Sequence, residues 1–91
     1  MDRSGMILFA TGSELNEYIV SSLIANSPAE ESGLLVGDKL LKIQGLPARF
    51  YSLDQINRLM QKREGKRIKL TIERGAYTYK VTFKLRSLIW L

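Results

Sequence analysis

The chain is 91 residues long, which suits one small domain near the lower size limit of a single hydrophobic core. Hydrophobic residues make up 45% of it and the net charge is +5, as in many globular proteins. Cysteine and histidine are absent, which excludes disulfides, thiolate chemistry and histidine-based acid–base catalysis, and argues against hydrolysis by this chain.

The distribution of charge and hydrophobicity bears on possible partners. Acidic residues predominate up to residue 38 and basic residues after it, and we interpret this as two solvated faces of opposite sign. The basic residues alternate with apolar ones along expected strands, so no nucleic-acid partner is expected. No apolar run approaches the roughly 20 residues that span a bilayer, so we expect no membrane insertion, and residues 1–5 do not resemble the start of a signal peptide.

Three apolar runs in the first half of the chain predict strands. They cover residues 6–9, 18–24 and 39–43, and each is followed by residues that favour a turn.

Two helices are expected from their N-terminal caps. Ser27 is followed by proline, a residue favoured at the first helical position, which predicts a short helix over residues 28–32. Ser52 and Gln55 have the spacing of a capping box and predict a helix from Leu53 to about Lys62.

The clearest periodicity comes last. Apolar and polar residues alternate over residues 68–72 and again over residues 77–85, on either side of a turn at Gly75. This predicts an antiparallel hairpin with one buried face. Together, the elements predict an α+β fold, a five- to six-stranded antiparallel barrel or sandwich with two helices.

Residues 27–45 resemble the hallmark of PDZ domains, S-P-A-x-x-A-G-L-x-x-G-D-x-I-L-x-I-N-G. Ser32, Leu40 and Gln44 are mild departures from it, where the pattern has Ala, Ile and Asn. Asp38 of this segment is expected to bond nearby backbone amides and to begin the next strand.

The resemblance extends over essentially the whole chain and is to the bacterial, protease-associated type of PDZ domain. Residues 3–5, 51–59 and 83–89 further resemble the C-terminal PDZ domain of bacterial retropepsin-like aspartyl proteases. High-temperature-requirement serine proteases, carboxy-terminal processing proteases and membrane-embedded metalloproteases carry similar modules. The resemblance implies a protease as parent protein and a location in the periplasm or cell envelope.

The resemblance also implies a peptide-binding groove between an exposed strand edge and the second helix. The loop that binds a ligand's terminal carboxylate in the family, X-Φ-G-Φ, is matched by Arg3-Ser4-Gly5-Met6, where Ser4 departs because it is polar. The amides of Ser4, Gly5 and Met6 are expected to form an anion nest, which the charge of Arg3 would supplement.

Along the strand that follows, alternation is expected to direct Met6 and Leu8 into the groove and Ile7 and Phe9 toward the core. An alternative places all four in the core. The implied peptide-binding residues are Arg3, Ser4, Gly5, Met6, Ile7, Leu8, Leu53, Asn57 and Met60.

On the helix, Leu53, Asn57 and Met60 are expected to form the opposing wall, with Ile56 and Leu59 toward the core. An apolar residue at position 53 implies an apolar ligand side chain two positions before the terminus.

These features predict a non-catalytic module that docks extended or C-terminal hydrophobic peptides, without cofactor or metal. We expect one domain over residues 1–91, with its core in residues 1–86 and a tail in residues 87–91. A role in catalysis is disfavoured, because Ala10 stands where the D-T-G motif of an aspartyl protease needs its first Asp.

Two other roles stay open. The domain could dock structurally onto its own protease or a neighbouring subunit without binding free peptide. The hydrophobic end at residues 89–91 could occupy a neighbour's groove and cause weak self-association, or pack on its own domain.

Overall fold

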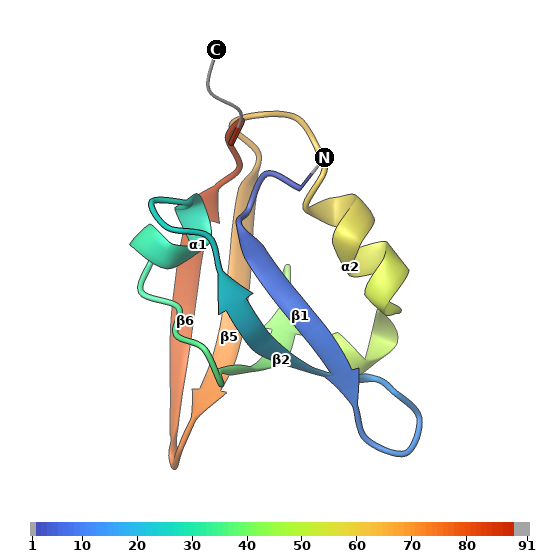
Figure 1. Ribbon diagram of the computed structural model, residues 1–91. Helices are drawn as coiled ribbons and strands as arrows, with labels where there is room; N and C mark the ends of the chain where they lie inside the picture. Colours follow the sequence, from blue (N-terminus) through green and yellow to red (C-terminus); the bar gives the residue numbers. More distant parts are fainter. Residues whose placement is uncertain (1, 89–91) are drawn as a thin grey trace.

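The computed structural model describes residues 2–88, which form a six-stranded antiparallel sheet with the order β1-β2-β3-β5-β6, and β4 paired to β3. The strands are β1 (Met6–Thr11), β2 (Glu17–Leu23), β3 (Lys39–Ile43), β4 (Leu46–Pro47), β5 (Arg67–Arg74) and β6 (Tyr77–Lys84). The sheet curls so that β1 and β2 lie in front of β5 and β6 (Figure 1). This confirms the predicted α+β fold with an antiparallel sheet.

The helices begin where their caps predict. In α1 (Pro28–Glu31) the Glu30 N–H donates to Ser27 Oγ over 3.3 Å. In α2 (Leu53–Leu59) the Gln55 N–H donates to Ser52 Oγ over 3.1 Å and the Ser52 N–H donates to Gln55 Oε1 over 2.8 Å, so the capping box is confirmed. A short 3-10 turn, Ala48–Phe50, precedes α2.

The second helix ends earlier than predicted. Its C-terminal cap is Met60, and the expected end at about Lys62 is wrong. The Gln61 and Lys62 amides bond to carbonyls three residues back, those of Arg58 and Leu59, so the chain has already left α-helical geometry for tighter turns. Within residues 2–88, no helix has the length and apolar character needed to cross a bilayer.

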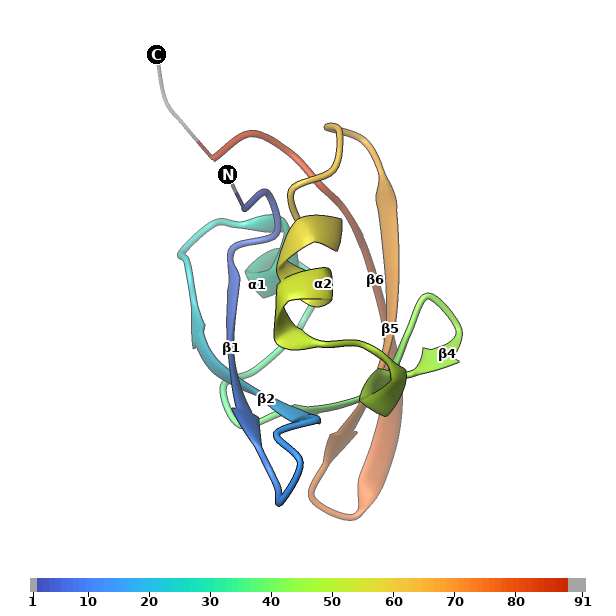
Figure 2. The ribbon, with the colours of Figure 1, turned by 90° about the vertical axis from the view of Figure 1, so that its right-hand side faces the viewer.

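The core lies between the curled sheet and the two helices, and α2 covers the open side between β1 and β5 (Figure 2). Its buried apolar residues come from every long strand and from α2: Met6, Tyr18, Val20, Ala29, Leu34, Leu40, Ile43, Ala48, Ile56, Met60, Ile68, Leu70, Ile72, Val81, Phe83 and Leu85.

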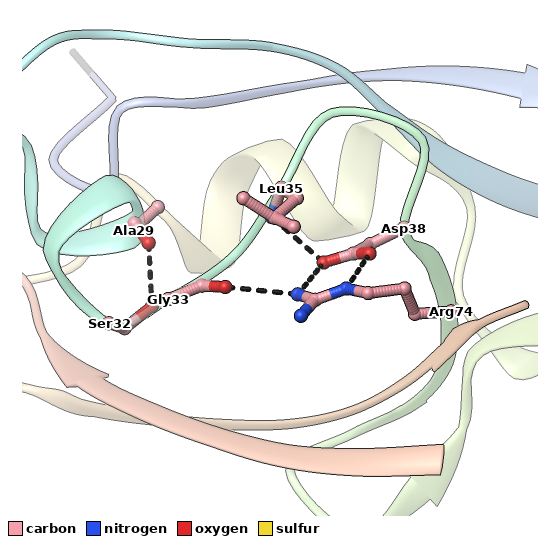
Figure 3. Close-up of polar contacts among 6 residues, drawn as sticks. All are labelled: Ala29, Ser32, Gly33, Leu35, Asp38 and Arg74. Carbon is pink, nitrogen blue, oxygen red and sulfur yellow. Dashed lines mark hydrogen bonds and ion pairs between the residues drawn. The ribbon is translucent and has the colours of Figure 1, made fainter. Parts of the chain in front are cut away.

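An ion pair between Asp38 and Arg74 attaches the segment over residues 27–45 to the end of β5 (Figure 3). Arg74 at the end of β5 donates Nε to Asp38 Oδ1 over 2.8 Å and Nη2 to Asp38 Oδ2 over 2.7 Å. The same guanidinium bonds the Gly33 carbonyl over 3.0 Å, and the Leu35 amide donates to Asp38 Oδ2 over 2.9 Å. The predicted amide bond to Asp38 is confirmed, and Arg74 is a partner that the sequence pattern did not reveal.

This arrangement determines the charge state of Asp38. Burial alone would raise the pKa of its carboxyl, but hydrogen bonds from Arg74 and the Leu35 amide, with the positive charge of Arg74, hold the pKa below its ordinary value. Asp38 is therefore ionised at neutral pH and keeps the loop between α1 and β3 attached to β5.

Candidate functional site

Strand β1 lies at the border of the sheet beside α2, and no strand of residues 2–88 pairs with its outer edge (Figures 1 and 2). Its partner β2 places Val20 opposite Leu8. The Val20 N–H donates to the Asp38 carbonyl and its C=O accepts from the Gly37 N–H, each over 2.8 Å, so both groups point away from β1. Leu8 and Val20 are thus a pair without mutual hydrogen bonds. The Leu8 N–H and C=O therefore point away from β2, toward the outer edge of the sheet.

The inner face of β1 provides an apolar floor beside that edge. Met6 is buried, and Leu8 and Ala10 are partly buried against the core. Ile7 and Phe9 are 49% and 47% exposed. Their predicted direction toward the core is therefore wrong, as is the alternative that all four residues are core.

The physical reason is that α2 and the core lie on the same side of β1. Helix α2 packs over the inner face of the curled sheet (Figure 2). The same alternate residues of β1 therefore line the space beneath α2 and contact the core, and the others face outward.

The residues of α2 that were predicted to form the other wall differ in their burial. Leu53 is partly buried against the core and Asn57 is exposed on the helix, and their place in a peptide-binding wall stays a prediction. Ile56 is buried as expected, and Leu59 is partly buried. Met60 is only 1% exposed, so its predicted place on an open wall is wrong: the helix ends there, and the side chain joins the core.

The N-terminal end of α2 is tethered to the sheet by two tyrosines. The Tyr18 hydroxyl of β2 donates to the Tyr51 carbonyl just before the helix, and the Tyr51 hydroxyl donates to the Ile43 carbonyl of β3 over 3.0 Å. Burial raises the pKa of Tyr18, so this donor stays protonated at neutral pH.

The C-terminal end of α2 is tethered by Arg3. Its backbone N–H donates to the Met60 carbonyl over 2.8 Å, and its guanidinium Nη1 donates to the carbonyls of Gln61 and Lys62 over 3.1 and 2.8 Å. A cation here complements the negative end of the helix. Arg3 thus links the segment before β1 to the end of α2, and the predicted contribution of its charge to the nest stays a prediction.

The loop expected to form an anion nest already holds a carboxylate. Asp2 Oδ1 accepts hydrogen bonds from the Ser4 N–H (2.7 Å), the Ser4 hydroxyl (2.7 Å) and the Gly5 N–H (3.1 Å). The Met6 N–H donates to Ser4 Oγ over 3.0 Å. The three amides predicted to be free for a ligand therefore have partners within the chain.

Sequence reasoning missed Asp2, although a signal was present. An Asp side chain commonly bonds the backbone amide two residues later, and Asp2 precedes Ser4 by that spacing. Of the predicted tail over residues 87–91, the hydrophobic end at residues 89–91 lies outside the described residues, whereas the Ser87 N–H donates to Glu64 Oε1 over 3.0 Å.

Three comparisons with known proteins agree with this architecture. A family model described as PDZ domain matches residues 19–74, more than half of the chain. The chain is 32% identical over 68 residues to a "Probable CtpA-like serine protease" of Staphylococcus haemolyticus. The aligned region covers 75% of this chain but only 14% of that protein.

Solved structures share the fold at low sequence identity. The photosystem II D1 C-terminal processing protease superposes with a TM-score of 0.82 at 16% identity, over 97% of this chain and 24% of that one. The HtrA3 PDZ domain bound to a phage-derived ligand (FGRWV) superposes with a TM-score of 0.77 at 16% identity, over 94% of this chain and 86% of that one.

The predicted similarity to an aspartyl protease is wrong, because the curated relatives are serine proteases. The stretches that suggested it include the cap and body of α2 and the end of β6, which build the fold itself. Residues that stabilise the fold in this way do not distinguish one class of parent enzyme from another.

Proposed function

The chain belongs to the PDZ domain family, whose domains are themselves non-catalytic, and we propose that it binds an extended hydrophobic peptide as an added strand on β1. The observation that carries this proposal is the outward-pointing N–H and C=O of Leu8 at a sheet border beside α2. Unpaired main-chain groups at an edge are a template for another strand.

A peptide in this position would run antiparallel to β1. Its main chain would pair with Leu8, and alternate side chains would contact the apolar floor and Leu53. Because both ends of α2 are tethered, the helix does not need to be ordered when the peptide binds, which limits the entropy lost on binding. A few strand hydrogen bonds at about 1 kcal/mol each favour micromolar affinity.

We further propose that the parent protein is a serine protease in which this domain docks the substrate or regulates the protease. The similarity to the CtpA-like relative supports this role. The chain spans 14% of that relative's length, so the proposal concerns a protein of which this domain is a part. A location in the periplasm or cell envelope stays a prediction.

The decisive experiment removes the edge N–H and keeps the fold. Leu8→Pro deletes the outward N–H, and proline is tolerated on the free side of an edge strand. Leu8→Ala is the matched control, since it also shortens the side chain but keeps the N–H. A library of displayed hydrophobic peptides is panned against wild type, and the dissociation constants of the best binders are measured for all three proteins.

We expect Leu8→Pro to bind at least tenfold more weakly than Leu8→Ala, with both variants folded by circular dichroism. Equal affinities for the two variants would show that the peptide does not pair with β1.

A structural docking role is the second candidate, and the outer face of β1 favours it. Ile7 and Phe9 are large apolar side chains on the same exposed face of the edge strand. Such a face can pack on another domain of a parent protein. Failure of every peptide in the library to bind wild type would favour this role.

A further inference from the structure

The loop predicted to bind a ligand's terminal carboxylate is occupied by an acidic side chain of the chain itself. The Ser4 and Gly5 amides donate to Asp2 Oδ1, and the Met6 amide donates to Ser4 Oγ, which itself donates to Asp2 Oδ1. Ser4 is fully buried, so this small network is closed to solvent on the Ser4 side.

We infer that Asp2 takes the place of a ligand's terminal carboxylate, so that the groove selects internal extended segments over free C-termini. The inference rests on the proposed strand addition at β1. An internal segment needs only the free main-chain groups of the β1 edge around Leu8, which lie beyond the occupied loop.

Asp2 is well placed to keep this position against a competing peptide. The next residue, Arg3, is held on both sides, because its N–H donates to the Met60 carbonyl and its C=O accepts from the Arg86 N–H over 3.2 Å. A carboxylate held this close to the amides that donate to it has a high effective concentration, which an unlinked carboxylate must exceed.

Charge adds to this barrier. A peptide ending beside the loop would bring its terminal carboxylate close to the carboxylate of Asp2. Two negative charges that lie close together repel each other. An internal segment carries a neutral peptide group at that point. The structure thus disfavours a free C-terminus both by occupying its donors and by repelling its charge.

The test compares random octapeptides displayed in two formats, at the free C-terminus of a carrier or between two carrier domains. The best clones from each are synthesised as free acids and as C-terminal amides, and dissociation constants are measured for wild type, Asp2→Ala and Asp2→Asn. Glu73→Ala is the matched control, since it removes an exposed carboxylate on β5 outside the loop.

We expect wild type and Glu73→Ala to enrich internal clones and to bind acid and amide within about threefold of each other. Asp2→Ala should bind the acid at least tenfold more tightly than the amide. Asp2→Asn, which keeps the acceptor oxygen but not the charge, should fall between them, and it carries the test if Asp2→Ala does not fold.

Two results would count against these ideas in distinguishable ways. A tenfold preference of wild type for the free acid, unchanged in Asp2→Ala, overturns the inference and leaves strand addition standing. No enrichment in either format, for wild type and for Asp2→Ala, refutes the proposed function and the inference with it.

Discussion

Replacing Arg74 with methionine should destabilise the domain by about 2–3 kcal/mol, because it leaves a buried carboxylate without its cation. Asp38 is 1% exposed and would keep only its bond from the Leu35 amide. Removing one partner of a fully buried ion pair costs about 3–5 kcal/mol. The Arg74 side chain is 34% exposed, so water already weakens the ion pair. The expected loss is therefore at or below the lower end of that range, about 2–3 kcal/mol.

The free energy of unfolding is measured by urea titration and Tm by heating, both monitored by far-UV circular dichroism. For a domain of this size, a loss of that magnitude corresponds to a fall in Tm of about 10–20 °C. Arg67→Met is the matched control on the same strand, since Arg67 is exposed, and it should change the free energy of unfolding by less than about 0.5 kcal/mol.

The dependence on pH provides a second readout. The folded-state pKa of Asp38 lies below the ordinary value of 3.8, so in wild type its contribution to stability is present above pH 3.8 and is lost as the pH falls through the lower folded-state pKa. In Arg74→Met, burial dominates and should raise the pKa of Asp38 above 3.8 instead. The stability difference between the two proteins should therefore be largest at neutral pH, and it should shrink as the pH falls through the raised pKa of the variant and then through the lowered pKa of wild type.

Two outcomes would refute this reasoning. One is a loss in Arg74→Met no larger than in Arg67→Met. The other is a stability difference that stays constant between pH 3 and pH 7, which would mean that the loss comes from packing and not from the charge of Asp38.

Two further predictions concern residues around the groove. Gly5→Ala should cost more than about 2 kcal/mol, because Gly5 has φ +80° and an added Cβ would lie 2.1 Å from the Ser27 Cβ; thermal unfolding checks this, and an unchanged Tm would contradict the close approach. Met60→Asp should cost about 3 kcal/mol or more, whereas Leu53→Asp should mainly weaken peptide binding. Urea unfolding and peptide titration of the two variants separate these effects, and a Met60→Asp protein as stable as wild type would place Met60 outside the core.

Local hydrogen bonding was predictable from the sequence alone. The caps at Ser27 and Ser52 act on amides three residues away, so the residue types and their spacing are sufficient to identify them. The hairpin of β5 and β6 follows from alternation around one turn, and its register pairs Arg74 with Tyr77 as that turn requires. The family hallmark lies in one continuous segment and was recognisable for the same reason.

What the tertiary structure decided depends on contacts between distant parts of the chain. Alternation in β1 separates Met6 and Leu8 from Ile7 and Phe9, but only the packing of α2 over the curled sheet determines which pair faces inward. Likewise, the engagement of Arg3 at the end of α2 joins residues 58 or more positions apart, beyond the reach of any local pattern. A strand's period defines two faces, and burial against other elements decides which one becomes the site.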